Sequence, residues 1–349
     1  MTAVLEPHVK AVRARLREIW AAEAMSEESV IKAQTHNLVI VAHSLPQEAN
    51  ALANRMVGIT TERPGRVILV LVEPDAEPDV RAEAMAFCRV DGRRQVCGEL
   101  ITLEAGGDTY KELHSTIIGL LAPSLPVFVW WGLPLDREDH LLRHLLPEAD
   151  RLLVDSHQYP GVLPVLAQMA ATPRSDLNWN RLAPWRQLLA RLWDAHGASA
   201  LAHINSVDIH HAQGAQVRAL LLLSWLASRL DWTLNTAERT ASGGLLTRWR
   251  AGPALHDLKA ELLPVAANGS EPGSLQGIYI QAGAEPPYVM PRLELAGDCV
   301  ELRRDESSLN SQFMPFQPVD LTGALAAEID NDPDPHLMAA LDISAALLS

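Results

Sequence analysis

The chain has 349 residues, 48% of them apolar, and a formal net charge of −14. A chain of this length exceeds what one ordinary hydrophobic core contains, so we expect two domains. The acidic charge argues against nucleic acid or an anionic membrane as a partner, because both attract clustered lysine and arginine.

No apolar run is long enough to cross a membrane. The N-terminal residues 9–20 mix charged and apolar side chains at helical spacing, which is unlike a secretory signal peptide. Three cysteines, an odd number, fit a reducing compartment. These features together predict a soluble, cytoplasmic protein.

The first predicted elements are a helix over residues 7–24, a strand over 38–42, a helix over 47–59 and a strand over 66–72. The last of these is a continuous apolar run, which is typical of a strand covered on both faces of a parallel sheet. Strand, helix and strand at this spacing predict a right-handed βαβ unit.

Two strand-like runs, residues 83–90 and 95–104, flank Asp91-Gly92, which is a strong hairpin signal. The elements expected after them are a helix over 110–121, a strand over 127–131, a helix over 137–146, a strand over 151–155 and a helix over 162–171. The pattern predicts an α/β domain over residues 1–174, with a doubly wound, mostly parallel sheet and an inserted hairpin.

The second predicted domain, residues 175–349, is α+β. It begins with a helix over residues 182–193, whose apolar stripe carries two tryptophans. The later elements are a strand over 202–210, a helix over 212–230, short strands over 232–236, 245–250, 258–265, 277–280 and 300–304, and closing helices over 321–329 and 336–348. Short strands separated by turn residues predict a mixed or antiparallel sheet.

Cys88 and Cys97 lie on the two arms of the predicted hairpin. A turn over Asp91 to Arg94 would place them opposite each other, where a disulfide and a redox switch are possible. A two-residue Asp91-Gly92 turn would change the register and separate them. The Asp-Gly pair favours the second arrangement.

The chain has no G-x-G-x-x-G, Walker A or G-x-S-x-G motif and no pair of C-x-x-C motifs. We therefore expect no cofactor and no catalytic centre. His140 and His144 are four residues apart on a predicted helix, as in some metal sites. No third ligand is evident, and Glu138 and Asp139 suggest a solvated face, so we predict no metal there.

Polar residues follow several predicted strands: His43, Trp131-Gly132 and Asp155-Ser156-His157. Ligands of open α/β sheets bind beyond the carboxyl ends of the strands. A cleft lined by His43, Asp155, Ser156 and His157 could hold a sugar phosphate, either as a sensor or as an enzyme. The alternative is that Asp155 and Ser156 cap the next segment and the histidines are solvated.

Four segments resemble, in order, the glucose-6-phosphate dehydrogenase assembly proteins, the OpcA family. They are Asn37-Leu38-Val39-Ile40-Val41-Ala42, Leu125-Pro126-Val127-Phe128-Val129-Trp130-Trp131-Gly132, Asp150-Arg151-Leu152-Leu153-Val154-Asp155-Ser156, and Asp176-Leu177 with Trp179, Arg181-Leu182 and Pro184-Trp185-Arg186. The likeness covers most of the chain and fades toward the C-terminus.

The resemblance implies a non-catalytic protein that binds glucose-6-phosphate dehydrogenase, promotes its active oligomer and raises its activity. The cofactor site would then belong to the partner. Tryptophan and arginine are enriched at binding hot spots, so the candidate contact residues are Trp130, Trp131, Trp179, Arg181 and Arg186. Successive side chains of a strand point to opposite faces, so at least one of Trp130 and Trp131 should face solvent or be covered by the second domain.

Overall fold

The computed structural model describes residues 6–24, 29–32, 34–44, 46–91, 94–157, 159, 161–169, 172–196, 198–266, 274–283, 292–303 and 311–348. Contacts divide the chain into two compact units. Unit 1 comprises Met1–Asp155, Met169–Leu177 and Leu321–Pro333, and unit 2 comprises Ser156–Gln168, Asn178–Asp320 and Asp334–Ser349. The two units therefore interleave along the sequence. A boundary at residue 174 between separately folding domains stays a prediction.

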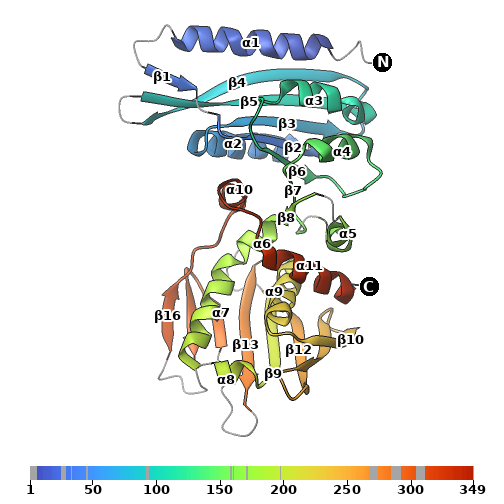
Figure 1. The fold of residues 1–349 in the computed structure, drawn as a ribbon, viewed down its shortest axis with the longest axis vertical. Helices are drawn as coiled ribbons and strands as arrows, with labels where there is room; N and C mark the ends of the chain where they lie inside the picture. Colours follow the sequence, from blue (N-terminus) through green and yellow to red (C-terminus); the bar gives the residue numbers. More distant parts are fainter. Residues whose placement is uncertain are drawn as a thin grey trace. The chain divides into compact units, whose positions relative to one another are not determined.

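Unit 1 is built on one sheet with the strand order β1-β5-β3-β2-β6-β7-β8, and β4 pairs with β5 (Figure 1). Its strands are β1 (Ser29–Lys32), β2 (Asn37–His43), β3 (Arg66–Glu73), β4 (Val80–Asp91), β5 (Arg94–Gly106), β6 (Val127–Gly132), β7 (Arg151–Val154) and β8 (Arg174–Asp176). All neighbours are parallel except β4 and β5. This confirms the doubly wound, mostly parallel sheet with its inserted hairpin.

The apolar runs of β2 and β3 form the centre of this sheet. Side chains from Leu38 to Val41 and from Val67 to Val70 have no exposed surface, as expected for strands covered on both faces. Helix α2 (Pro46–Glu62) connects β2 to the parallel β3 and so completes the predicted βαβ unit. The carboxyl ends of β3, β2 and β6 consequently lie side by side.

The helices of unit 1 include one from near the C-terminus. They are α1 (Glu6–Ala24), α2, the 3-10 turn η1 (Gly107–Glu112), α3 (His114–Leu120), α4 (His140–Leu145), the 3-10 turn η2 (Leu146–Glu148) and α10 (Leu321–Asp330). Glu328 of α10 accepts bonds from Arg151 of β7 at 2.8 Å and from the hydroxyl of Ser175 of β8 at 2.5 Å. This buried contact attaches α10 to the sheet.

Unit 2 contains the second sheet, with the order β10-β11-β12-β9-β13-β14-β15-β16. Its strands are β9 (Ile204–Ala212), β10 (Thr233–Arg239), β11 (Leu245–Ala251), β12 (His256–Val265), β13 (Leu275–Ala282), β14 (Arg292–Ala296), β15 (Cys299–Arg303) and β16 (Gln312–Pro315). The β9–β12 pair is parallel and the other pairs are antiparallel. The predicted mixed sheet is therefore confirmed.

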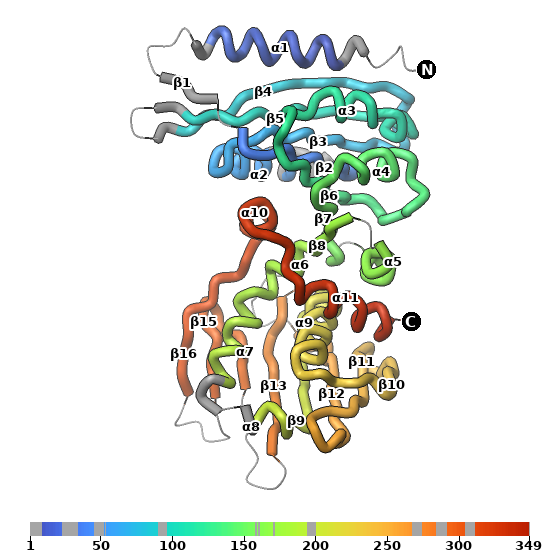
Figure 2. The backbone as a smooth tube through the Cα atoms, in the orientation of Figure 1, coloured from blue at the N-terminus to red at the C-terminus, as the bar shows by residue number. Residues whose placement is uncertain are grey.

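Helices pack on this second sheet and on one another. They are α5 (Val162–Gln168), α6 (Leu177–Arg181), α7 (Ala183–His196), α8 (Ala198–Leu201), α9 (Gln216–Arg229) and α11 (Pro335–Leu348). The tube view shows α11 lying along α9 (Figure 2), where the buried hydroxyl of Ser344 donates to Ser224 at 2.9 Å. No described helix combines the length and the hydropathy that crossing a membrane requires.

Candidate functional site

A cavity of about 800 Å³ opens at the carboxyl ends of β2, β3 and β6. This is where an open α/β sheet binds its ligands, because the chain leaves the sheet in opposite directions on either side of β2. The lining residues described are His43, Val72, Pro74, Gly107, Asp108, Tyr110, Lys111, Trp131, Leu133, Pro134, Asp136, Glu138, Asp139 and His140. Of the four residues that the sequence offered for such a cleft, His43 lines the cavity, whereas Asp155, Ser156 and His157 are not among these residues.

The cavity has the wrong charge for a phosphate group. Four carboxylate side chains, Asp108, Asp136, Glu138 and Asp139, line it together with one lysine. Lys111 is itself paired with Asp108 at 2.8 Å. Phosphate sites need arginine, lysine or free backbone N–H groups directed at the anion. An acidic lining repels such a ligand.

A dinucleotide, which this type of sheet commonly binds, does not fit the residues present. Its pyrophosphate needs a glycine-rich turn after the first strand, so that the backbone can approach closely. Here the first glycine after β2 is Gly58, well inside α2. The carboxylate at the end of β3, Glu73, accepts a hydrogen bond from the Ser44 hydroxyl at 3.1 Å. The turn after β2 therefore has no glycine-rich motif of the kind that holds a pyrophosphate.

The wall of the cavity is fixed by hydrogen bonds around α4. Asp139 caps the helix by accepting from the Leu142 N–H at 3.0 Å. Its other oxygen accepts from the Tyr110 hydroxyl at 2.9 Å. Burial and this bond raise the pKa of Tyr110 well above its ordinary value, so the phenol stays protonated and continues to donate.

Three histidines gather beside this wall, where the sequence indicated two. His140 and His144 lie on α4, and His114 is the first residue of α3. The ring centroids of His114 and His144 are 4.5 Å apart, and those of His140 and His144 are 4.3 Å apart. Burial, with the two neighbouring imidazoles, lowers the pKa of His114. The third histidine of this group comes from α3, so the spacing within one helix could not indicate it.

Trp130 and Trp131 are both buried, each with 2% of its surface exposed. Neither indole faces solvent, and Trp131 also lines the cavity, where its Nε1 donates to the Pro134 carbonyl at 3.3 Å. Direct contact with a partner through these rings stays a prediction, and their burial gives it no support.

In unit 2, Trp179 and Arg186 form a cluster with Asp334. The Trp179 ring is 1% exposed, and its Nε1 donates to Asp334 at 2.8 Å. The Arg186 guanidinium lies over that ring, 3.9 Å from its centroid, and donates to the Trp179 carbonyl at 2.6 Å. Desolvation lowers the pKa of Arg186 to about 10. Asp334, which completes this cluster, is 155 residues from Trp179, and no local pattern indicated it.

Arg181, like Arg186, lies in unit 2 and is neither fully buried nor fully exposed. Its side chain is half-buried and donates to the amide oxygen of Asn178 at 3.2 Å. The oxygen of Asn178 also accepts from Arg218 at 2.9 Å. Two guanidinium groups therefore converge on one amide oxygen. Contact between Arg181 and a partner stays a prediction.

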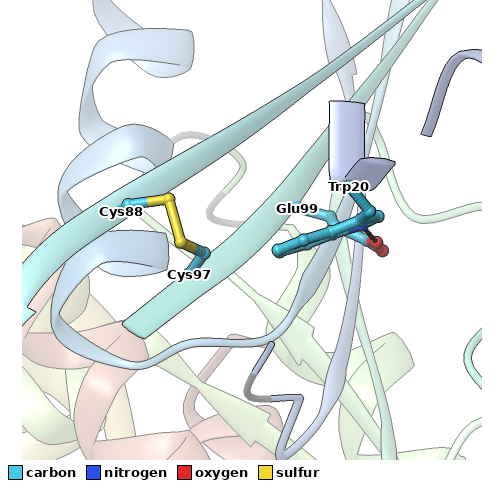
Figure 3. Close-up of a disulfide and its surroundings, with 4 residues drawn as sticks. All are labelled: Trp20, Cys88, Cys97 and Glu99. Atoms are coloured by element: carbon cyan, nitrogen blue, oxygen red, sulfur yellow. Dashed lines mark hydrogen bonds between the residues drawn. A yellow bond between two sulfur atoms is a disulfide. The ribbon is translucent and has the colours of Figure 1, made fainter. Parts of the chain in front are cut away.

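Cys88 and Cys97 form a disulfide between β4 and β5 (Figure 3). The register pairs Asp91 with Arg94, which places the two cysteines opposite each other. The preference for a tight Asp91-Gly92 turn was therefore wrong, although Gly92 itself lies outside the described residues. The thirteen-residue β5, paired on both sides, sets the register more strongly than the local turn preference does. The redox role of the pair stays a prediction.

Close to this disulfide, a buried carboxylate ties α1 to the sheet. Glu99 of β5 has no exposed surface and accepts from Trp20 of α1 at 2.6 Å (Figure 3). Its other oxygen accepts from Arg66 Nε at 2.7 Å. A buried carboxylate is stable when it is paired and hydrogen-bonded in this way, so Glu99 has a structural role.

The fold and the crevice define a class: an α/β protein with a doubly wound, mostly parallel sheet and a second, mixed sheet. The fold is shared with glucose-6-phosphate 1-dehydrogenase from Mycobacterium avium, at a TM-score of 0.51 and 11% identity over 90% of this chain and 92% of that chain. Two family models, described as the N-terminal and C-terminal domains of a glucose-6-phosphate dehydrogenase subunit, match residues 57–171 and 172–336. The chain belongs to this family, the OpcA assembly proteins.

Curated relatives carry the same family name. A putative OxPP cycle protein OpcA from Synechocystis is 35% identical over 75% of this chain and 57% of its own length. The protein of that name from Nostoc punctiforme is 30% identical over 64% of this chain and 51% of its own length. The chain thus spans about half the length of the curated relatives it matches.

Proposed function

We propose that this protein is a non-catalytic partner of glucose-6-phosphate dehydrogenase, which binds the enzyme, favours its active oligomer and raises its activity. Family membership supports the choice of partner. The observation that carries the non-catalytic part is the acidic crevice, which lacks the glycine turn that a dinucleotide requires. In this proposal the enzyme supplies the cofactor and the catalytic groups.

The mechanism is a shift between states of the enzyme. A partner that binds the active oligomer better than the inactive form moves the equilibrium by the difference in affinity. Couplings of this kind amount to about 1–3 kcal/mol, or about 5–150-fold. The protein acts in the cytoplasm, where this enzyme works, and needs neither nucleic acid nor a membrane as a partner.

Arg181 is the residue we propose for direct contact. It is half-buried and already oriented by Asn178, so little side-chain freedom is lost on binding. The nearby Arg186 lies over the Trp179 ring and pairs with Asp334 at 3.8 Å. Trp130 and Trp131 are buried, so the contact test below uses Arg181.

A sugar-phosphate sensor or enzyme is the other function that the sequence left open. The described cavity contains His43, but its carboxylates oppose a phosphate. This alternative is therefore the weaker one.

The test is a binding experiment with the purified dehydrogenase of the same organism. We expect a complex in size-exclusion chromatography with light scattering, together with a shift of the enzyme toward its larger oligomer. Arg181→Gln should weaken binding by about 10-fold or more, as for a moderate hot spot. Arg239→Gln, the same change on an exposed residue of β10, is the matched control.

A second arm of the experiment tests the crevice. Isothermal titration of this protein alone with NADP⁺ should show no binding. If NADP⁺ binds, or if the two proteins elute separately at every concentration used, the proposed function is wrong.

A further inference from the structure

The three histidines at α3 and α4 have the arrangement of a metal-ligand set. One nitrogen from each of His114, His140 and His144 lies within 4.8 Å of the other two. In a tetrahedral zinc site with Zn–N bonds near 2.0–2.1 Å, the ligand nitrogens are about 3.4 Å apart. Shifts of about 1 Å, within the range of small rotations of side chains on a short surface helix, therefore bring the three nitrogens to one ion.

Hydrogen bonds to the backbone leave two of these rings ready to coordinate. His140 Nδ1 lies 2.8 Å from the Lys111 carbonyl, and His144 Nδ1 lies 2.7 Å from the His140 carbonyl. A carbonyl only accepts, so both Nδ1 atoms carry the hydrogen and both Nε2 atoms present a lone pair. Histidines that bind metal typically donate their second N–H to a carbonyl in this way.

The third ring, that of His114, differs from the other two in its hydrogen bonding. Its Nδ1 is buried and has no hydrogen-bond partner within the part of the chain that the structure describes. A buried polar atom left without a partner costs about 1–3 kcal/mol and requires an explanation, and an ion is one of the ordinary ones. A metal ion held between the rings would satisfy this atom.

The surroundings favour a cation. His140 lines the cavity whose other ionisable lining residues include four carboxylates. Three imidazoles also leave a fourth coordination position open for water or for a donor from a small molecule.

We propose that His114, His140 and His144 bind a divalent transition-metal ion, with Zn²⁺ the best match to three imidazole ligands. Imidazole is a ligand of intermediate softness that suits Zn²⁺, Cu²⁺ and Ni²⁺, whereas Mg²⁺ and Ca²⁺ prefer oxygen. This inference does not depend on the proposed function, because it uses only three side chains of unit 1 and their hydrogen bonds.

The experiment is isothermal titration of the full chain with ZnCl₂, after treatment with a chelator and removal of any affinity tag. We expect one tight site per chain, with a dissociation constant on the order of 1 μM or lower. His144→Ala should weaken Zn²⁺ binding by at least about 100-fold. Removing a residue that merely hydrogen-bonds to a metal ligand already weakens binding by about 10–100-fold, and removing a ligand itself should cost more. His336→Ala, which removes an exposed histidine of α11, is the matched control and should leave the affinity unchanged.

A second readout guards against a variant that merely misfolds. Co²⁺ bound by three imidazoles should give the visible absorption bands of a tetrahedral site, and His140→Ala should remove them while circular dichroism stays unchanged. The proposal is overturned if the chain binds no Zn²⁺, or if a His140→Ala/His144→Ala double variant binds it as tightly as the original protein.

Discussion

Replacing Arg151 by methionine tests whether the segment Leu321–Pro333 is truly part of unit 1. Arg151 and Glu328 are 7% and 5% exposed at the side chain, and their charged atoms are 2.8 Å apart. The same guanidinium donates to the backbone carbonyls of Glu328 and Asn331 at 2.8 and 2.9 Å. The substitution keeps an unbranched stem but removes the positive charge, while the hydroxyl of Ser175 still donates to the buried carboxylate.

The expected cost follows from the burial of this pair. Removing one member of a buried ion pair destabilises a protein by about 3–5 kcal/mol, because a charge remains in a poorly solvated place. For a folding unit of 150–250 residues, each kcal/mol lowers the melting temperature by about 2–4 °C, so we expect a decrease of about 6–20 °C. A double variant, Arg151→Met/Glu328→Leu, should recover most of this loss because no charge stays behind.

Urea unfolding followed by tryptophan fluorescence measures the effect. Asp330→Asn, on the same helix, is the control: its pair with Arg63 spans 2.7 Å but is 47% and 30% exposed, so the loss should stay below about 1 kcal/mol. If Arg151→Met costs no more than Asp330→Asn, α10 is not held on the sheet by this pair and the reasoning is refuted.

Three further predictions concern stability. Burial lowers the pKa of His36 to about 4 from about 6.5. Between these two pH values the unfolded chain binds more protons than the folded one, so stability should fall by about 3 kcal/mol as the pH drops from about 6.5 to about 4. In urea titrations at both ends of this range, His36→Gln should show a smaller fall, and an equal fall would exclude His36 as its source. Trp179→Phe removes the bond to Asp334 at 2.8 Å and should cost about 1.5–3 kcal/mol, the range for a hydrogen bond to a charged group, in the same assay; no change would mean that the bond contributes nothing. Reducing the bond between Cys88 and Cys97, which are nine residues apart, should cost about 2–3 kcal/mol through the freedom regained by the unfolded chain. Dithiothreitol should therefore lower the stability of the original protein and leave Cys88→Ala/Cys97→Ala unaffected; a similar response in both would assign the effect to something else.

The elements that the sequence predicted best are those whose local pattern agrees with their surroundings. The apolar run of β3 (Arg66–Glu73) and the helix before it could be read directly, because a strand buried on both faces needs apolar side chains throughout. The mixed second sheet also followed from short strands and turn residues. The helix expected over 110–121 begins later, at His114, because residues 107–112 form a 3-10 turn.

The parts that could not be predicted depend on contacts between distant segments. His114 joins His140 and His144 through the packing of α3 against α4, which no spacing within one helix reveals. The same holds for Glu328, whose partners lie on β7 and β8. The opposition of Cys88 and Cys97 was set by the pairing of long strands, and the local turn preference indicated the other register.

The most direct test of the central claim is the rate of glucose-6-phosphate dehydrogenase measured against increasing amounts of this protein. NADPH formation is recorded with the enzyme alone, with this protein alone and with both at several ratios. Our account predicts no NADPH from this protein alone and a saturable rise in the rate of the enzyme, by about 5–150-fold if the coupling is of ordinary size. A rate that does not change at any ratio, or NADPH formed by this protein alone, would contradict the account.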